Sequence, residues 1–269
     1  MNNIRFGNQT YTWQMNIQKY QGALPQIIEV TKRGNLAGIE PELCMLGDFW
    51  EKPWKLAEIL TEHQLKLAAL SLTCDWQEPD ETDVELELAN KTISMLVKYF
   101  PDTVLNLGQM AGKDRQHLAI RQKNAISCLN AVSKRATECG IVAVFHPNSA
   151  TGSIFRIDAD YDFMFEHIDC RTLGFAPDSG HIAKGGMDPV AVIKDHLSII
   201  RHVHFKDMDS DGNWVKMGQG IIDFLGILEA LKEYSGWVMI EDESSEALID
   251  PDQVAIDNGL YINKLKEEF

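Results

Sequence analysis

The 269-residue sequence predicts an α/β fold, a single (β/α)8 TIM barrel that spans residues 1–269. The length is close to the roughly 250 residues that such a barrel takes. Short apolar runs alternate about eight times with longer amphipathic segments, the pattern of parallel strands and their covering helices. No G-x-G-x-x-G motif follows the first apolar run, which counts against the open sheet of a dinucleotide-binding fold.

Eight strands are expected along the chain. Each candidate is short and rich in Val, Ile, Leu or Phe, as parallel strands that are buried on both faces should be. They lie at residues 4–11, 36–40, 65–73, 103–107, 141–146, 173–177, 200–205 and 236–241.

The segments between these strands carry helix signals. Residues 24–31 repeat apolar side chains at spacings of three and four. The Asp-Pro pairs at 188–189 and 250–251 each place a capping Asp before a Pro in the first helical position. Gly34 and Gly140 stand where a helix should end and the next strand begin.

The charge balance and the cysteines limit the possible partners and surroundings. The chain has 25 Lys and Arg against 40 Asp and Glu, a formal net charge of −15. This balance would repel nucleic acid and anionic lipid, so we expect neither a nucleic-acid nor a membrane partner. Five cysteines without a C-x-x-C pair favour a reducing compartment over a disulfide framework or zinc ribbon. With neither a signal peptide nor an apolar membrane span in the sequence, the expected location is the cytoplasm.

Polar and ionisable residues stand at the ends of most predicted strands. In a β/α barrel, functional residues concentrate at the carboxyl ends of the strands. Buried charge is costly unless it is paired or bound to metal, so this many strand-end charges indicate a functional site. The residues are Glu40 on the second strand, Asn106 on the fourth, His146 on the fifth, Asp178 on the sixth, His204 and Lys206 on the seventh, and Glu241 on the eighth.

Strand alternation predicts which of these side chains share a face. His202, His204 and Lys206 alternate along the seventh strand and point the same way. His202 lies deeper, so we interpret it as a hydrogen-bonded core histidine and His204 as the ligand. On the eighth strand we prefer Glu241 over Glu243 as the metal ligand. The alternative interpretation of Glu243 is a side chain that is simply solvated.

The predicted metal ligands are Asp178, His204, Glu241 and His146. A mixed set of carboxylates and imidazoles suits Mn²⁺, Co²⁺, Zn²⁺ or Fe²⁺ better than Ca²⁺. Without thiolates the site does not look like a closed structural zinc site. Two alternatives stay open: Asp178 as a cap of the following turn, and His146 as a proton carrier instead of a ligand.

Several motifs together resemble the xylose-isomerase-like TIM barrels, a family of sugar isomerases, ketose 3-epimerases, inosose dehydratases and endonuclease IV. The motifs are LAGIEPE at 36–42, PDSGH at 177–181, HVHFKD at 202–207, WVKMGQGIIDF at 214–224 and GWVMIEDES at 236–244. The resemblance covers most of the chain and implies that Asp178, His204 and Glu241 bind metal and that His181 contacts substrate. The epimerases carry a metal-binding Glu where this chain has His146, and the inosose dehydratases look similar to this chain there. The net charge makes the endonuclease branch a poor match.

The resulting expectation is a metal-dependent sugar isomerase or epimerase that acts on a keto sugar or keto polyol through an enediolate. An inosose dehydratase-like lyase and a non-catalytic sugar-binding barrel are the alternatives.

Glu241 and His146 are the candidate bases, and His181 and Lys206 would protonate or orient oxygens. Lys206 has a second interpretation, as a partner of Asp207. The expected substrate contacts are Glu40, Asn106, Asn148 and Trp13, with Trp50 and Trp214 as further apolar walls. Glu40 has two further interpretations, as a residue that orients a ligand or as the cap of a loop. Because related barrels assemble, a homodimer or homotetramer is also expected.

Overall fold

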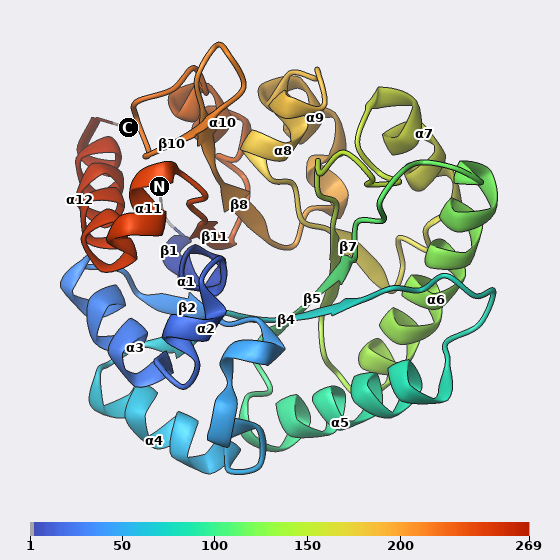
Figure 1. Cartoon of the computed structure of the whole chain (residues 1–269), viewed down its shortest axis with the longest axis horizontal. Helices are drawn as coiled ribbons and strands as arrows, with labels where there is room; N and C mark the ends of the chain where they lie inside the picture. Colours follow the sequence, from blue (N-terminus) through green and yellow to red (C-terminus); the bar gives the residue numbers. More distant parts are fainter. Residues whose placement is uncertain (1–2, 269) are drawn as a thin grey trace.

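The computed structural model describes residues 3–268 and places parallel strands around one axis, with helices outside them (Figure 1). The predicted α/β barrel is confirmed. Seven strand positions are single strands: β1 (Ile4–Gln9), β2 (Gly38–Glu40), β5 (Val104–Gln109), β6 (Ala143–His146), β7 (Leu173–Phe175), β8 (Val203–Phe205) and β11 (Gly236–Ile240). The third position is shared by β3 (Lys66–Leu67) and β4 (Ala69–Cys74).

The barrel closes from two arcs of parallel strands. One arc has the order β3-β2-β1-β11-β8 and the other the order β4-β5-β6-β7. Parallel bridges pair Glu42 with Ser71 at one seam, and Asp178 with His204 at the other. The second seam therefore brings two of the predicted metal ligands side by side.

The ends of the predicted strands differ from the observed ones by up to three residues, and in two strands the differences involve other elements. The first was expected to reach residue 11 but ends at Gln9, because the short helix α1 (Tyr11–Gln14) begins there. The third, expected at 65–73, is divided at Ala68, because β3 pairs with β2 whereas β4 pairs with β5.

Helices form the outer layer of the barrel (Figure 1). Within residues 3–268 there are eight of them. They are α3 (Leu24–Arg33), α4 (Pro53–Glu62), α5 (Asp83–Tyr99), α6 (Leu118–Glu138), α7 (Asp158–His167), α9 (Pro189–His196), α10 (Phe224–Ala230) and α12 (Pro251–Glu268). The capping predictions at both Asp-Pro pairs are confirmed. The carboxylate of Asp188 accepts the N–H of Val190 at 2.9 Å, and that of Asp250 accepts the N–H of Gln253 at 3.1 Å.

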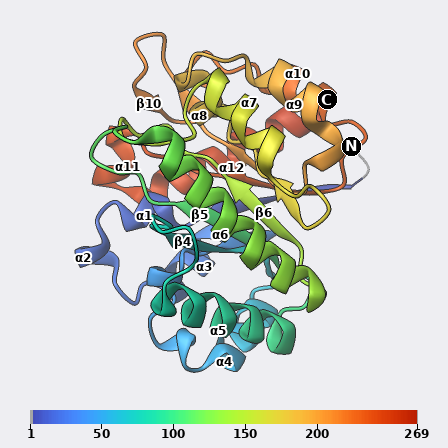
Figure 2. The ribbon, with the colours of Figure 1, turned by 90° about the vertical axis from the view of Figure 1, so that its right-hand side faces the viewer.

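Short helices and strands follow the carboxyl ends of the barrel strands. Figure 2 shows β10 and α11 at that end of the barrel. These elements are α2 (Ile17–Tyr20), η1 (Leu43–Met45), η2 (Gly47–Trp50), α8 (Ser179–Lys184), the ribbon of β9 (Asp207–Met208) and β10 (Trp214–Val215), and α11 (Ser245–Ile249). A further turn, η3 (Leu197–Ile199), precedes β8. The functional end of the barrel is thus built from segments that follow the strands.

Apolar side chains fill the lower part of the barrel interior. Trp237 and Met239 of β11 occupy much of it, and glycines of neighbouring strands make room for them. A Cβ on Gly7 would lie 2.4 Å from Cε of Met239, and one on Gly38 would lie 2.6 Å from the Trp237 ring. The remaining space is lined by small residues, namely Ala68, Ala69, Val104, Val144 and Ala176. This packed floor leaves the upper interior to polar side chains.

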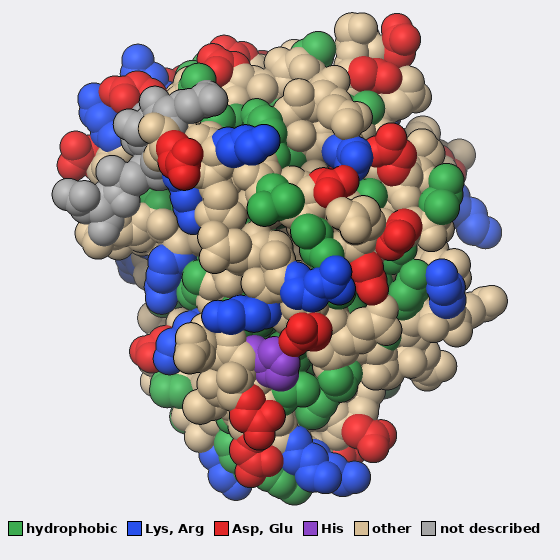
Figure 3. Space-filling model, turned by 90° about the vertical axis from the view of Figure 1, so that its left-hand side faces the viewer, with side chains coloured by type: hydrophobic (Ala, Val, Ile, Leu, Met, Phe, Trp, Pro, Cys, Tyr) green, Lys and Arg blue, Asp and Glu red, His purple; other side chains and the backbone are tan. Residues whose placement is uncertain are grey.

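Basic and acidic side chains are interspersed on the face drawn in Figure 3, and the hydrophobic ones there are scattered. That face has no extended patch of one sign among the residues drawn in colour. Within residues 3–268, none of the helices combines the length and the apolar character that a membrane crossing requires.

Candidate metal centre

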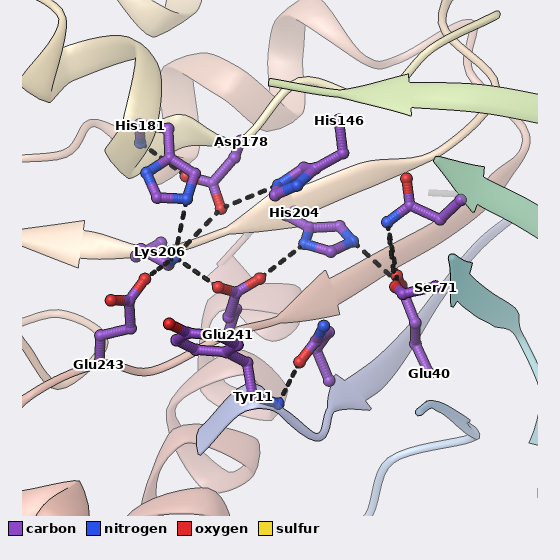
Figure 4. Close-up of polar contacts among 12 residues, drawn as sticks. Tyr11, Glu40, Ser71, His146, Asp178, His181, His204, Lys206, Glu241 and Glu243 are labelled. Atoms are coloured by element: carbon purple, nitrogen blue, oxygen red, sulfur yellow. Dashed lines mark hydrogen bonds and ion pairs between the residues drawn. The ribbon is translucent and has the colours of Figure 1, made fainter. Parts of the chain in front are cut away.

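Four side chains from successive strand ends converge at the top of the barrel (Figure 4). His146 ends β6, Asp178 follows β7, His204 lies in β8 and Glu241 follows β11. One potential ligand atom from each lies within 4.8 Å of the others. Asp178 and His204 are fully buried, and Glu241 is nearly so. The structure thus brings together the four residues that the sequence predicted as ligands.

Asp178 both caps a helix and presents an oxygen to this cluster. Its Oδ1 accepts the backbone N–H of His181 at 2.7 Å, which caps α8. Its Oδ2 faces Nε2 of His146 at 3.7 Å, too far for a hydrogen bond. Both atoms are buried and lack a hydrogen-bond partner within the described chain. Such atoms are costly unless something else binds them, so the pair fits a cation.

His204 lies between two carboxylates. Its Nδ1 is 3.0 Å from Oε2 of Glu241, and its Nε2 is 3.0 Å from Oε2 of Glu40. Burial alone would lower the pKa of His204, but the charges of Glu40 and Glu241 outweigh it and raise this pKa to about 10. The histidine therefore carries two protons, one of them on Nδ1, where a divalent cation would take its place.

Glu40 supports His204 from below instead of facing substrate. Besides His204, its carboxylate accepts hydrogen bonds from Ser71 at 2.7 Å, Asn106 at 2.6 Å and His202 at 2.6 Å. Burial opposes its charge, yet His204 and His202 hold the pKa of Glu40 well below the usual range. His202 is confirmed as a hydrogen-bonded core histidine.

The buried positions of Glu40 and Asn106 do not support them as substrate contacts, and that of Glu40 agrees with the alternative interpretation that it orients a ligand. Neither side chain lines the cavity above the cluster, because Asn106 donates downward into the same buried network. Both residues lie on the expected strands, but their side chains lie deeper in the barrel interior than the residues that line the cavity.

Lys206 occupies the centre of a second, acidic group beside the four ligands (Figure 4). Its Nζ donates to Glu241 and Glu243, lies 3.9 Å from Oδ2 of Asp178, and is 3.1 Å from Nε2 of His181. Burial would lower the pKa of Lys206, but these carboxylates raise it instead. Glu243, expected in solvent as the alternative to Glu241, is a partly buried partner of this lysine.

Asp207 has a different role from the predicted pairing with Lys206. Its carboxylate accepts the backbone N–H groups of Met208, Gly218 and Gly220 at 2.9 Å each, and that of Ile222 at 3.3 Å. These bonds close the loop that carries β10. A Cβ on Gly220 would lie 2.2 Å from Oδ1 of Asp207, so this close approach requires glycine.

His181 links Lys206 to the cavity. Its burial and then the nearby charge of Lys206 lower the pKa of His181 to about 3, so the ring is neutral. With Nε2 accepting from Lys206, Nδ1 carries the proton and donates to Oγ of Ser149 at 2.8 Å. Lys206, His181 and Ser149 therefore form a continuous chain of hydrogen bonds.

A cavity of about 560 Å³ opens above the cluster. His146, His181, Glu241 and the predicted contact Asn148 line it. The polar lining residues that the sequence analysis missed include Gln9, Tyr11, Gln14, Glu42, Thr73, Ser149 and Lys184, and Glu243 was not expected in the cavity. For Glu42 a signal existed, because it lies two residues beyond Glu40 and so shares its strand face. Burial, then the charges of Glu40 and Glu241, raises the pKa of Glu42 to about 7.

The family model of the xylose isomerase-like TIM barrels matches residues 36–264 of this sequence. The chain belongs to this family. Among the proteins similar to this chain is an inosose dehydratase of Geobacillus thermodenitrificans (strain NG80-2), 29% identical over 159 residues. That match covers 52% of this chain and 53% of the relative, so the chain spans about half the length of that curated relative.

Two solved structures show the same fold at low identity. One is 3-keto-D-glucoside 4-epimerase, YcjR, from E. coli, with a TM-score of 0.75, 16% identity, and coverage of 97% of this chain and 99% of that one. The other is the IOLI protein with a binding zinc atom, with a TM-score of 0.73, 17% identity, and coverage of 96% and 95%.

Within this xylose isomerase-like barrel, Trp13 is not a substrate contact, which corrects the prediction. Its ring is fully buried, and its Nε1 donates to Asp252 at 2.7 Å, which ties α1 to α12. Trp50 also lies outside the cavity, whereas Trp214 of β10 lines it. Asn148 keeps its predicted place and donates to the backbone oxygen of Gln109 at 2.9 Å.

We expect Glu40→Gln to weaken divalent-metal binding by about 10- to 100-fold, as loss of the partner of a ligating histidine commonly does. The neutral amide in this variant attracts the N–H at Nε2 of His204 less strongly than the carboxylate of Glu40 does. The proton is then less firmly held on Nε2, and Nδ1 is less available for the metal. Chelator competition would measure the dissociation constant. Ser71→Ala is the matched control. It removes a hydrogen bond to Oε1 of Glu40 but keeps the contact between Oε2 of Glu40 and His204. Equal effects of the two variants would contradict the role of Glu40.

Proposed function

We propose that this protein is a divalent-metal-dependent enzyme that removes a proton beside the carbonyl of a keto sugar or keto polyol and so forms an enediolate. The observation that carries the proposal is the pair of buried ligand atoms on His146 and Asp178 that lack a hydrogen-bond partner within the described chain, beside His204 and Glu241 and below one cavity. A zinc atom in the IOLI structure supports a metal in this fold.

The proposed ligands are Asp178, His204, Glu241 and His146, with Mn, Co, Zn and Fe as the candidate ions. A divalent cation there would polarise the substrate carbonyl and stabilise the negative charge that develops on its oxygen. Glu241 and His146 remain the proposed proton acceptors beside the carbonyl. Glu42 is a further acceptor, since a pKa of about 7 suits a base at neutral pH.

Dehydration is the outcome that we favour after proton removal. A departing hydroxide needs a proton, and the chain from Lys206 through His181 to Ser149 ends at the cavity, where it can deliver one. The inosose dehydratase relative supports the same choice. A keto-inositol is therefore the first substrate to test.

Isomerisation or epimerisation is the second candidate. Epimerisation through an enediolate requires proton removal and return on opposite faces of the substrate and so uses two proton carriers, whereas isomerisation can proceed with one. Glu42 follows the second strand and His181 the sixth, positions on opposite sides of an eight-stranded barrel, and both line the cavity. The keto-glucoside epimerase among the structural neighbours has the same fold.

Metal-loaded protein incubated with a keto-inositol and with keto sugars would separate these reactions. Dehydration gives an enone absorbance and the loss of one water in the mass spectrum. Epimerisation or isomerisation leaves the mass unchanged and alters the NMR spectrum of the sugar. Tight metal binding without turnover of any of these compounds would contradict the proposed function and favour a sugar-binding barrel.

We expect His146→Gln to lower turnover by about 100-fold or more while leaving the metal content nearly unchanged if His146 carries a proton. Parallel loss of metal would make it a ligand instead. Metal content by atomic emission and turnover of the same sample distinguish the two roles. Asn148→Ala, which changes a neighbouring cavity residue without an imidazole, is the matched control.

A further inference from the structure

The cavity has two chemically different ends. The four proposed ligands all come from the strands in positions five to eight of the barrel. On the opposite side of the same cavity, above positions two to four, Glu42, Thr73 and Gln109 lie at the strand ends, and apolar side chains line the wall beyond them. We name the apolar residues of this wall the apolar end; they are Leu43, Cys44, Leu88, Met110 and Ala111.

The apolar end is built by separate segments that meet at the cavity. Leu43 lies in η1 after β2, Leu88 in α5 after β4, and Met110 directly after β5. Leu43 and Leu88 pack partly on the core of the protein, which gives this wall a fixed position. Met110 is 50% exposed, so part of an apolar surface remains open at the mouth.

The volume exceeds what a free sugar needs. About 560 Å³ lies within the range of roughly 300–1,000 Å³ that encloses drug-sized ligands, which are larger than one sugar ring. A free polyol extended into the apolar end would place hydroxyl groups against Leu43, Leu88 and Met110. Those hydroxyls would lose their hydrogen bonds to water without replacement.

We propose that the apolar end binds an uncharged aromatic or alkyl group attached to the sugar, so that the substrate is a keto glycoside and not a free monosaccharide. The inference rests on the proposed function, because the sugar ring would occupy the other end of the same cavity. Side chains between the two ends, including Gln9, Thr73 and Gln109, offer hydrogen bonds to the ring hydroxyls.

Binding of unreactive glycosides tests the apolar end directly. Phenyl and methyl glycosides of glucose, galactose and xylose would be titrated into the metal-loaded full chain by calorimetry. We expect a phenyl glycoside to bind about tenfold more tightly than its methyl counterpart, as burial of a ring predicts. Leu88→Ser with Met110→Ser should abolish this preference and leave the methyl glycoside affinity unchanged, which also shows that the variant is folded.

Two controls complete the test. Met110→Ser alone changes a half-exposed residue and should reduce the preference in part. Val97→Ser, on the same helix as Leu88, 44% exposed and outside the cavity, should keep the full preference. No phenyl preference in the wild type, no binding of any phenyl glycoside, or a preference that survives the double variant would overturn the inference.

Turnover is measured separately, so the two proposals can fail independently. A phenyl preference that depends on Leu88 and Met110, without turnover of any keto compound, supports the apolar end and rejects the proposed function. Turnover of free keto sugars without any phenyl preference rejects the apolar end alone.

Discussion

Asp178→Ala is expected to abolish retention of the divalent metal and to lower turnover by about a thousandfold or more. The side chain supplies Oδ2, a fully buried oxygen without a hydrogen-bond partner among the described residues. Its removal also leaves the first turn of α8 without a cap, which costs about 1 kcal/mol of stability. Metal content, turnover and the free energy of unfolding of the metal-free protein would each be measured.

Asp178→Asn separates the two roles of this residue. The amide oxygen can still accept the N–H of His181, so the cap and the stability of the metal-free protein should be retained. The negative charge is lost, so metal binding should fall almost as far as in the Ala variant. Full metal content in both variants would show that the cation site lies elsewhere.

Lys206→Met is expected to have the second largest effect. It leaves Glu241, Glu243 and Asp178 without the ammonium among them, which should destabilise the metal-free protein by about 3–5 kcal/mol. Much of this loss should be recovered in the presence of metal, because the cation compensates the same carboxylates. Turnover should fall by about 100- to 10,000-fold even with metal bound, because the proton source of His181 is gone.

Lys216→Met is the matched control for Lys206→Met. Lys216 also pairs with two carboxylates, Glu246 and Asp257, but these pairs are at the surface and should contribute at most about 1 kcal/mol. Denaturant unfolding with and without metal measures both variants. If Lys206→Met unfolds at the same denaturant concentration as the wild type and retains turnover, the acidic group has neither of the proposed roles.

The barrel was predictable from the sequence because strands buried on both faces leave short apolar runs that polar helix faces interrupt. The ends of the strands were less predictable. The start of α1 at Tyr11 and the division of the third strand at Ala68 depend on pairing with distant strands. The ribbon of β9 and β10 was not predicted, because backbone bonds to Asp207 hold its loop.

The sequence predicts which side chains of the site point into the barrel, but not how far along the barrel axis each one lies. Strand alternation indicates which side chains point inward, which is why His204 and Glu241 meet. It does not indicate how far along the barrel axis each side chain lies, and so Glu40 was expected in the cavity although it lies below His204. Trp13 was expected there from its residue type, whereas its contact with Asp252 depends on the last helix. The apolar end combines three segments that only the closed barrel brings together.

The hydrogen bonds that Asp207 accepts determine which positions of its loop can be substituted. All four bonds go to main-chain N–H groups, so the shape of the loop depends little on the side chains it displays. Trp214 sits on this loop and faces the cavity. Exchange of Trp214 should change its contacts with His181 and Lys206 more than the backbone of the loop. Selectivity is therefore best altered by randomising position 214 while Asp207 and Gly220 are kept.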